Sequence, residues 1–175
     1  MVYSKTMINQ KPNVQELVVC SNVFIRKDGK YLLSKRSSQK KYAPNKIHPF
    51  GGKVDQDENP YDGAVREIKE EIGINIKNVK LESVVLELTD EEGLPANWLI
   101  FNFSADYDSG EIKNTEEGEI VYLTVEEIKS ADLFPSVKSI IDNILNPNDG
   151  TVFTTNGYHG FESGMEELSK NICVK

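Results

Sequence analysis

The sequence predicts one domain of the α/β (α+β) class. Its 175 residues are the usual length of a single domain, and a chain this long can bury a core without disulfides or structural metals. Runs rich in β-branched and aromatic residues predict strands along much of the chain. Three other segments carry helix start or stop signals. We therefore expect one mixed fold and one functional site within it.

The first predicted elements are two strands that form a hairpin. Residues 16–26 (ELVVCSNVFIR) and 30–36 (KYLLSKR) are β-rich runs, and residues 27–29 (KDG) between them are a turn signal. The polar and basic stretch 37–46 then predicts a loop. A short apolar piece, residues 47–50, follows this loop and ends at two glycines.

The next predicted element is an amphipathic helix between Asn59 and Gly73. Asn59 suits the N-cap because its side chain can accept hydrogen bonds from free amides, and Pro60 tolerates the first helical position. Gly73 is the matching stop signal. At about 100° per residue, an apolar stripe should face the core and an acidic stripe should adjoin it. The apolar stripe is Tyr61, Ala64, Val65, Ile68 and Ile72, and the acidic stripe is Glu67, Glu70 and Glu71.

The second half of the chain predicts further strands and two more helices. A match to a capping box at residues 124–127 (TVEE) predicts a short helix to about residue 131. Another helix is expected at 136–145, after a Phe-Pro pair. Strands are predicted at 79–88, 98–105 and 119–123, and also at 151–155 and 168–174, where a C-terminal β-hairpin extension covers residues 151–175.

Composition limits the partners and the compartment. The chain has 28 acidic and 20 basic residues, a net charge of -8, so its overall field repels polyanions and argues against a nucleic-acid polymer as partner. Cys20 and Cys173 form no metal or disulfide framework and suit a reducing cytoplasm. Residues 1–17 lack the apolar run of a signal peptide or membrane span. We expect a cytoplasmic monomer or homodimer, no membrane partner, and a flexible extension at residues 1–15.

The strongest functional signal is a continuous pattern over residues 52–74, GKVDQDENPYDGAVREIKEEIGI. Its seven fixed identities coincide by chance at roughly one start position in 10⁸. Three of its carboxylates, at i, i+3 and i+4 of the helix, repel each other by a few tenths of a kcal/mol per pair, roughly, in water. Hard divalent cations such as Mg²⁺ or Mn²⁺ prefer oxygen ligands and bridge to phosphates. The acidic stripe therefore predicts a metal site, in preference to a solvated acidic face.

Residues 52–74 match the Nudix box in every defined position, so the chain resembles the Nudix hydrolases. This resemblance implies an α/β/α sandwich with a mixed central sheet. It also implies a metal site for Mg²⁺ or Mn²⁺. Its expected ligands are Glu67, Glu70 and Glu71 of the box, the Gly51 carbonyl, and Glu117 from the acidic run 116–119. Without the resemblance, the composition of residues 116–119 also fits a solvated turn.

Residues around the box have more than one interpretation. Arg66 is expected to fix Glu67 and keep it ionised through a charged hydrogen bond, or else to form a surface ion pair with Glu70. Glu58 either stabilises the loop or reaches a metal through water, and Gly52 and Gly73 serve the loop and the helix cap. One glutamate should take a proton from the attacking water, and Glu67 and Glu70 are the two candidates.

Outside the box the resemblance is closest to the MutT-like nucleoside triphosphate pyrophosphohydrolases, including a branch that cleaves oxidised purine nucleotides. Arg36 and Lys53 match basic residues that contact phosphate there, although each could instead be merely exposed. Phe134 matches an aromatic residue that stacks on the base, and its alternative is a core position. Where relatives read the purine with an asparagine or with polar residues after the aromatic-proline pair, this chain has His48 and residues 136–138 (SVK). His48 is therefore a candidate base contact or a loop anchor.

The expected reaction is hydrolysis of a P–O–P bond in a nucleoside diphosphate-linked substrate, chiefly a nucleoside triphosphate cut to a monophosphate and pyrophosphate. Coenzyme A and dinucleoside polyphosphates remain open as substrates. An ADP-ribose hydrolase would carry a proline beyond the box, where residues 88–90 read LTD, and an isopentenyl diphosphate isomerase a cysteine before it, where residues 48–50 read HPF. A ligand sensor without turnover usually has a broken box or an added DNA-binding domain, and this chain shows neither.

Overall fold

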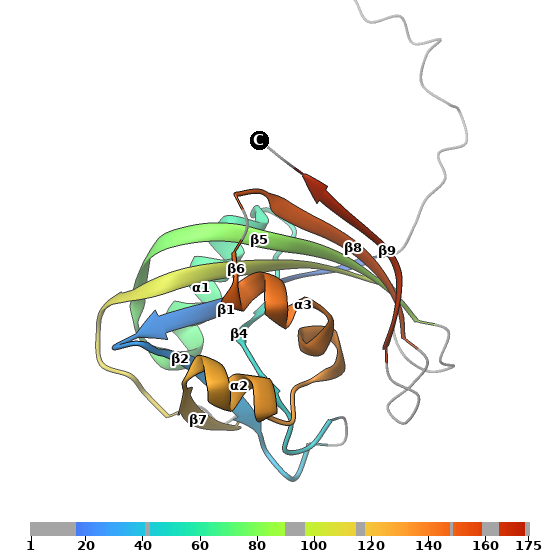
Figure 1. The fold of residues 1–175 in the computed structure, drawn as a ribbon. Coiled ribbons are helices and arrows are strands. Elements are labelled where there is room, and N and C mark those ends of the chain that lie inside the picture. Colours follow the sequence, from blue (N-terminus) through green and yellow to red (C-terminus); the bar gives the residue numbers. More distant parts are fainter. Residues whose placement is uncertain are drawn as a thin grey trace, which may run out of the picture.

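The computed structural model describes residues 17–40, 43–89, 97–114, 118–147, 149–158 and 165–173. The expected extension at residues 1–15 lies outside them. The described chain forms a mixed sheet with helices on both faces (Figure 1). The elements are β1 (Leu17–Lys27), β2 (Lys30–Arg36), β3 (Ile47–His48), β4 (Phe50–Lys53), α1 (Pro60–Ile72), β5 (Asn75–Thr89), β6 (Asn97–Ser109), β7 (Gly118–Leu123), α2 (Val125–Ser130), α3 (Pro135–Leu145), β8 (Thr151–Tyr158) and β9 (Met165–Cys173).

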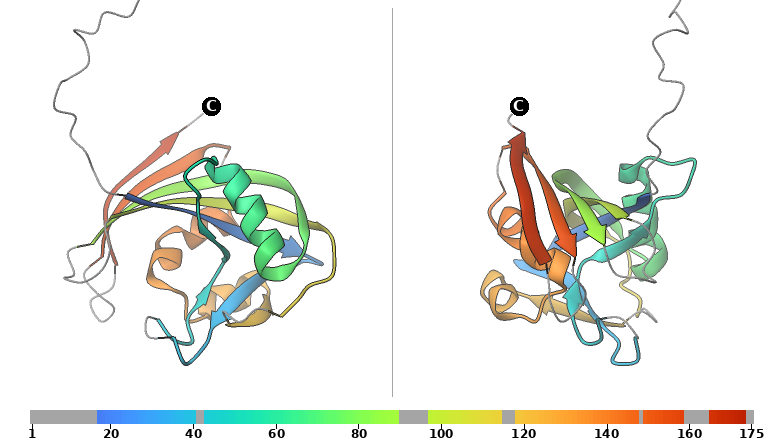
Figure 2. Two further views of the ribbon diagram at one scale, coloured as in Figure 1. Left: turned by 180° about the vertical axis from the view of Figure 1, so that it is seen from behind. Right: turned by 90° about the vertical axis from the view of Figure 1, so that its right-hand side faces the viewer.

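The sheet has the order β3-β2-β1-β6-β5-β8-β9, with β4 paired to β1 and β7 paired to β2. Two pairs are parallel, β1 with β6 and β5 with β8, and the other pairs are antiparallel. Helix α1 covers one face, whereas α2 and α3 cover the other (Figures 1 and 2). This arrangement confirms the expected α/β fold with a mixed central sheet.

The first hairpin confirms the turn signal read from the sequence. Lys27 pairs with Lys30, and the two residues between them, Asp28 (φ 50°) and Gly29 (φ 76°), both have positive φ. A two-residue turn of this kind matches the right-handed twist of the strands. The hairpin therefore fixes the register of β1 and β2 where the second core strand begins.

Strands β5 and β6 are longer than predicted. Both extend into polar sequence, residues 75–78 (NIKN) and 106–109 (DYDS). Asn75 pairs with Ser109 and their side chains also form a hydrogen bond of 2.9 Å. Register shifts along β5 let the long strand bend around the molecule. Pairing between the two strands thus outweighs the low β propensity of these residues.

Helix α1 has the predicted ends but a narrower buried stripe. Asn59 accepts hydrogen bonds from the amides of Tyr61 and Asp62, and Gly73 ends the helix with φ 78°. Two residues of the predicted stripe are exposed, Tyr61 (49%) and Val65 (37%). The reason is that the sheet contacts only a narrow line of helix residues that are spaced four positions apart. The remaining stripe residues, Ala64, Ile68 and Ile72, are fully buried.

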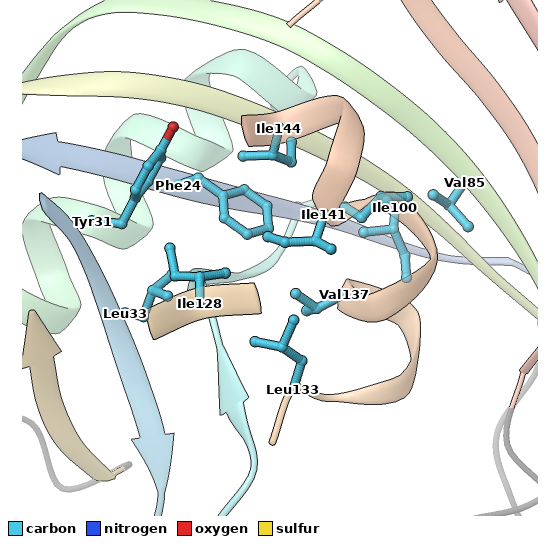
Figure 3. Close-up of a cluster of buried hydrophobic side chains, with 11 residues drawn as sticks. Phe24, Tyr31, Leu33, Val85, Ile100, Ile128, Leu133, Val137, Ile141 and Ile144 are labelled. Atoms are coloured by element: carbon cyan, nitrogen blue, oxygen red, sulfur yellow. The ribbon is translucent and has the colours of Figure 1, made fainter. Parts of the chain in front are cut away.

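The core consists of two layers, one on each face of the sheet. Under α1 the layer includes Val23, Ile25 and Phe103. Under α2 and α3 it includes Phe24, Val85 and Ile141 (Figure 3). Phe24 and its neighbours Val23 and Ile25 thus contribute to opposite layers, as alternation along a strand requires.

The C-terminal part confirms the predicted short helix, last helix and final strand pair. Thr124 and Glu127 form the complete capping box at the start of α2. Strands β8 and β9 pair with each other, and β8 also joins the main sheet beside β5. No helix among the described residues is long and apolar enough to cross a membrane.

Candidate functional site

The site is built where β4 passes between β1 and α1. The amide of Gly51 donates a 2.9 Å hydrogen bond to Glu71 Oε2. A Cβ atom on Gly51, which has φ 137°, would lie 2.0 Å from the carbonyl oxygen of Ser21. A Cβ atom on Gly52 would lie 2.5 Å from the carboxyl carbon of Glu67. Gly51 is therefore required for the strand to pass this close to β1, and Gly52 leaves room for the Glu67 carboxylate.

Arg66 is the centre of the ion pairs at this site. Its guanidinium donates to Glu58 Oε1 at 2.5 Å and Oε2 at 3.2 Å, to Glu67 Oε1 at 2.9 Å and to Glu70 Oε2 at 3.1 Å. It also donates to the Lys53 carbonyl at 3.1 Å, which ties the helix to the end of β4. The hydrogen bonds that Arg66 donates to Glu58 and then to Glu67 raise its pKa. Arg66 is therefore a permanent cation within a carboxylate cluster.

Glu58 is held by the loop that precedes α1. Its Oε1 atom accepts a 2.9 Å hydrogen bond from the amide of Asp55. The hydrogen bonds from Arg66, and next that from Asp55, lower the pKa of Glu58. Of the two roles predicted for Glu58, the structure shows the contacts that stabilise the loop.

Of the three box glutamates, Glu67 and Glu70 contact Arg66 and Glu71 contacts the Gly51 amide, and the three differ in exposure. The Glu67 side chain is 18% exposed and that of Glu70 is 61% exposed, while Glu71 is half-buried beside Gly51. Within the described ranges, no three acidic, histidine or cysteine side chains are arranged to hold a metal ion. Arg66 and the Gly51 amide occupy carboxylate oxygens that a cation would need. Glu117, the fifth expected ligand, lies outside the described residues.

A second group of predicted residues meets at the start of α3. The guanidinium carbon of Arg36 lies 5.8 Å from the centre of the Phe134 ring, and the His48 and Phe134 rings are 6.5 Å apart in an edge-to-face arrangement. The Phe134 amide donates to the Ile47 carbonyl at 2.9 Å, which fixes this segment against β3. The structure thus brings three predicted substrate contacts together.

An open cleft borders this group. It has a volume of about 490 Å³ and is lined by residues 35–38, Asn45, Gly118 and Glu119. Lys53 is separate from it: it pairs with Cys20 in the β1–β4 ladder and is exposed. The two predicted phosphate contacts therefore lie on different strands, Arg36 at the end of β2 and Lys53 at the end of β4.

Comparison with known proteins identifies the family. The family model described as the NUDIX domain matches residues 17–144. The chain belongs to the Nudix family. A MutT protein from Bacillus halodurans has a similar structure, with a TM-score of 0.72 and 24% identity over 89% of this chain and 97% of that one. A Nudix hydrolase from Nitrosomonas europaea has a TM-score of 0.62 and 20% identity over 75% of this chain and 90% of that one. These two structures share the fold of this Nudix domain.

Curated proteins match part of the sequence, among them one from Bacillus subtilis and one from Mus musculus. The uncharacterized Nudix hydrolase YvcI of Bacillus subtilis (strain 168) is 32% identical over 94 residues, 53% of this chain and 60% of that protein. The oxidized purine nucleoside triphosphate hydrolase of Mus musculus is 34% identical over 87 residues, 49% of this chain and 54% of that protein. The matches therefore span little more than half the length of each relative.

The chain also has buried polar residues that the sequence did not single out. Glu87 in β5 is only 6% exposed, and burial raises its pKa to about 7. Asn156 in β8, which is fully buried, lies opposite it in the register. The available signal was alternation, because Ser83, Val85 and Glu87 must share a face and Val85 is an obvious core residue.

Proposed function

We propose that this Nudix protein hydrolyses a P–O–P bond in a nucleoside diphosphate-linked substrate. The first candidate is a nucleoside triphosphate, cut to a monophosphate and pyrophosphate with Mg²⁺ or Mn²⁺ as cofactor. One observation carries the proposal: the α1 glutamates lie against a glycine strand that is shaped to approach them. Gly52 leaves room for the Glu67 carboxylate, since a Cβ atom there would be 2.5 Å from its carboxyl carbon.

The donor set fits a hard cation. Glu67, Glu70, Glu71 and the carbonyl of Gly51 would supply only oxygen ligands, which Mg²⁺ and Mn²⁺ prefer. When bound, the metal would supply charge neutralisation for the diphosphate and a lowered pKa for water. A fourth glutamate, Glu117, is part of the same proposal. Its acidic neighbours in the sequence and its position just before β7 support it.

The side chains of this protein then have separate tasks. Arg66 orients Glu67 and Glu70, because it donates to both carboxylates from one nitrogen. Glu67 or Glu70 accepts the proton of the attacking water. Lys53 of β4 and Arg36 of β2 bind substrate phosphates. The charges fit these assignments, because the cationic Lys53 and Arg36 would bind the anionic phosphates of the substrate.

The base end of the substrate is assigned to Phe134 and His48. Their rings lie 6.5 Å apart, and a base stacked on Phe134 would gain about 1 to 3 kcal/mol, by analogy with base stacking in single-strand binders. The relative from Mus musculus is named as an oxidized purine nucleoside triphosphate hydrolase. Its name supports a nucleotide substrate for this chain.

A product analysis tests the proposal. The pure protein is incubated with Mg²⁺ in ¹⁸O-labelled water and a panel of nucleoside triphosphates, dinucleoside polyphosphates, nucleotide sugars and coenzyme A. The expected result is a nucleoside monophosphate and pyrophosphate, with label in one phosphate product and none when metal is chelated. Binding of a nucleotide without uptake of label across the panel would instead identify a ligand sensor.

A further inference from the structure

A row of three neighbouring side chains lies on the α3 face of the sheet. Glu87 of β5 pairs with Trp98 of β6 on one side and with Asn156 of β8 on the other. Residues two positions earlier or later on the same strands point to the same face. Val85 and Ile100, two such residues, pack in the core layer under α3 (Figure 3). The row of Trp98, Glu87 and Asn156 therefore continues this layer with polar groups.

The row has hydrogen-bond acceptors that the described part of the chain leaves unpaired. Glu87 Oε2 and Asn156 Oδ1 are buried without a hydrogen-bond partner among the described residues. The amide nitrogen of Asn156 donates to Ser139 Oγ at 2.9 Å, so its oxygen stays available as an acceptor. Each unpaired buried group of this kind costs the fold about 1 to 3 kcal/mol. A ligand that offers two donors at this pair of neighbouring strands would satisfy both acceptors.

Cys20, which pairs with Lys53 of the glycine strand, relates the row to the phosphate end of the proposed substrate site. Cys20 of β1 faces the same side of the sheet, and its pKa is raised to about 11, mainly by burial, against the opposing effect of Lys53. The charges of Glu67 and Glu87 each raise it further, so the thiol lies within electrostatic range of both carboxylates. Strands β1 and β5 are two strand spacings apart, about 10 Å. This is the scale of one nucleoside.

The other end of the row approaches α3. Ser139, which binds Asn156, lies in the first turns of this helix. The same helix begins at Pro135, immediately after Phe134. The row is thus connected to the residue assigned to stack the base and lies on the same side of the sheet as α3.

We propose that Glu87 and Asn156 select a guanine base by accepting hydrogen bonds from its edge. This inference rests on the proposed nucleotide hydrolysis and adds the base that the site prefers. Two adjacent acceptors require two adjacent donors, and guanine offers its ring N1–H beside its 2-amino group. Adenine and cytosine place a ring acceptor next to their amino group, so one acceptor of the protein would face another.

Turnover of a matched pair of substrates tests the selection. dITP differs from dGTP only in lacking the 2-amino group, and we expect kcat/KM to favour dGTP by about tenfold or more. Glu87→Gln should reduce this ratio to about twofold. Asn156→Leu, which keeps the volume, should also reduce the ratio. Glu126→Gln removes the same charge from an exposed position of α2 and should keep it.

Binding measured without turnover separates this inference from the proposed hydrolysis. Trp98 is the single tryptophan of the chain and belongs to the row, so its fluorescence reports on a ligand there. Without metal, GMP should change the emission at concentrations about tenfold or more below those needed for IMP, and Glu87→Gln should abolish the difference. A selective response to GMP with no hydrolysis of any nucleotide would overturn the proposed function and keep the selection by Glu87. Equal responses to GMP and IMP, or none, would overturn the inference.

Discussion

One nitrogen of Arg66, Nη1, donates to both Glu67 and Glu70, at 2.9 and 3.1 Å. The two carboxylates belong to successive turns of the same helix face, where they would otherwise repel each other. Arg66 thus stabilises the acidic stripe in the metal-free protein and sets the positions from which the glutamates would bind a cation.

Glu70→Gln should lower kcat by about a hundredfold or more, because a ligand of the proposed metal cluster is lost. Its folded state should be unaffected. The Glu70 side chain is 61% exposed and its ion pair with Arg66 is therefore worth little, while its removal relieves repulsion within the stripe. Thermal melting without metal should show an equal or higher Tm. Unchanged turnover would contradict the site assignment, and a clear loss of Tm would contradict the account of repulsion.

Arg66→Met should lower the stability of the metal-free protein by about 1 to 3 kcal/mol, because Glu58 and Glu67 lose their charged hydrogen-bond donor. Urea denaturation measures this loss. Mg²⁺ should restore part of the stability, since a bound cation replaces the missing positive charge. The matched control is Arg26→Met, which removes an arginine from a 2.8 Å ion pair with Asp106 remote from the glutamates, and there Mg²⁺ should have no effect.

The two glycines should respond differently to alanine. In Gly51→Ala the new Cβ meets backbone at 2.0 Å and the residue has φ 137°, so Tm should fall by about 10 °C or more. In Gly52→Ala the new Cβ meets the flexible end of Glu67, which can move aside. That variant should lose less than about 1 kcal/mol of stability but should lose activity. Equal losses of stability in both variants would contradict this distinction.

The free energy of unfolding should depend on pH through Glu87. Burial raises its pKa from 4.5 to about 7, so between these values the folded protein keeps a proton that the unfolded chain has lost. Stability therefore falls as pH rises from 4.5 to about 7, by about 3 kcal/mol for this group, and then levels off. Urea denaturation at pH 5 and pH 8, in wild type and Glu87→Gln, measures the difference at about 25 °C. Between the two pH values the variant should lose less of its free energy of unfolding than the wild type. Equal losses in the two proteins would show that another group causes the pH dependence.

8-oxo-dGTP should be preferred over dGTP by less than about tenfold, a difference of about 1.4 kcal/mol. The N1–H and 2-amino donors that Glu87 and Asn156 would accept are present in both bases. His48→Ala should change the ranking among bases, whereas Phe134→Ala should raise KM for every nucleotide. Competition between the two substrates in one reaction gives the ratio directly. A preference of about a thousandfold, about 4 kcal/mol, would require contacts to the oxidised edge from other residues.

The features of the fold that the sequence predicts correctly are those set by local signals. The Asp28–Gly29 turn, the Asn59 cap and the Thr124 capping box each depend on neighbours within a few residues, and all three are present as expected. The ends of β5 and β6 depend on pairing between distant segments, such as Asn75 with Ser109. Local propensity contains no record of that pairing, and the predicted strands were therefore too short.

The same distinction applies to the site. The spacing within the box predicts which residues of α1 lie together, and Arg66 indeed contacts Glu67 and Glu70. Alternation along β5 was the sequence signal for the burial of Glu87, because it puts this residue on the face of Val85. It was not decisive, since an acidic residue near the end of a β run also fits a strand end that is exposed to solvent. Its neighbours across the sheet, Trp98 and Asn156, come from segments on either side of it in the chain.

The parallel pairing of β1 with β6 has a consequence for synthesis of the chain. Its register runs from Leu17 with Asn97 to Arg26 with Asp106, a constant separation of 80 residues. The apolar strand β1 therefore leaves the ribosome long before its central partner is translated, and only the hairpin with β2 is available to it at first. Distant parallel pairing of this kind slows folding and prolongs exposure of strand edges. The yield of native protein should accordingly depend on how fast residues 27–106 are translated and on whether chaperones protect β1 during that time. It should depend less on the stability of the finished fold.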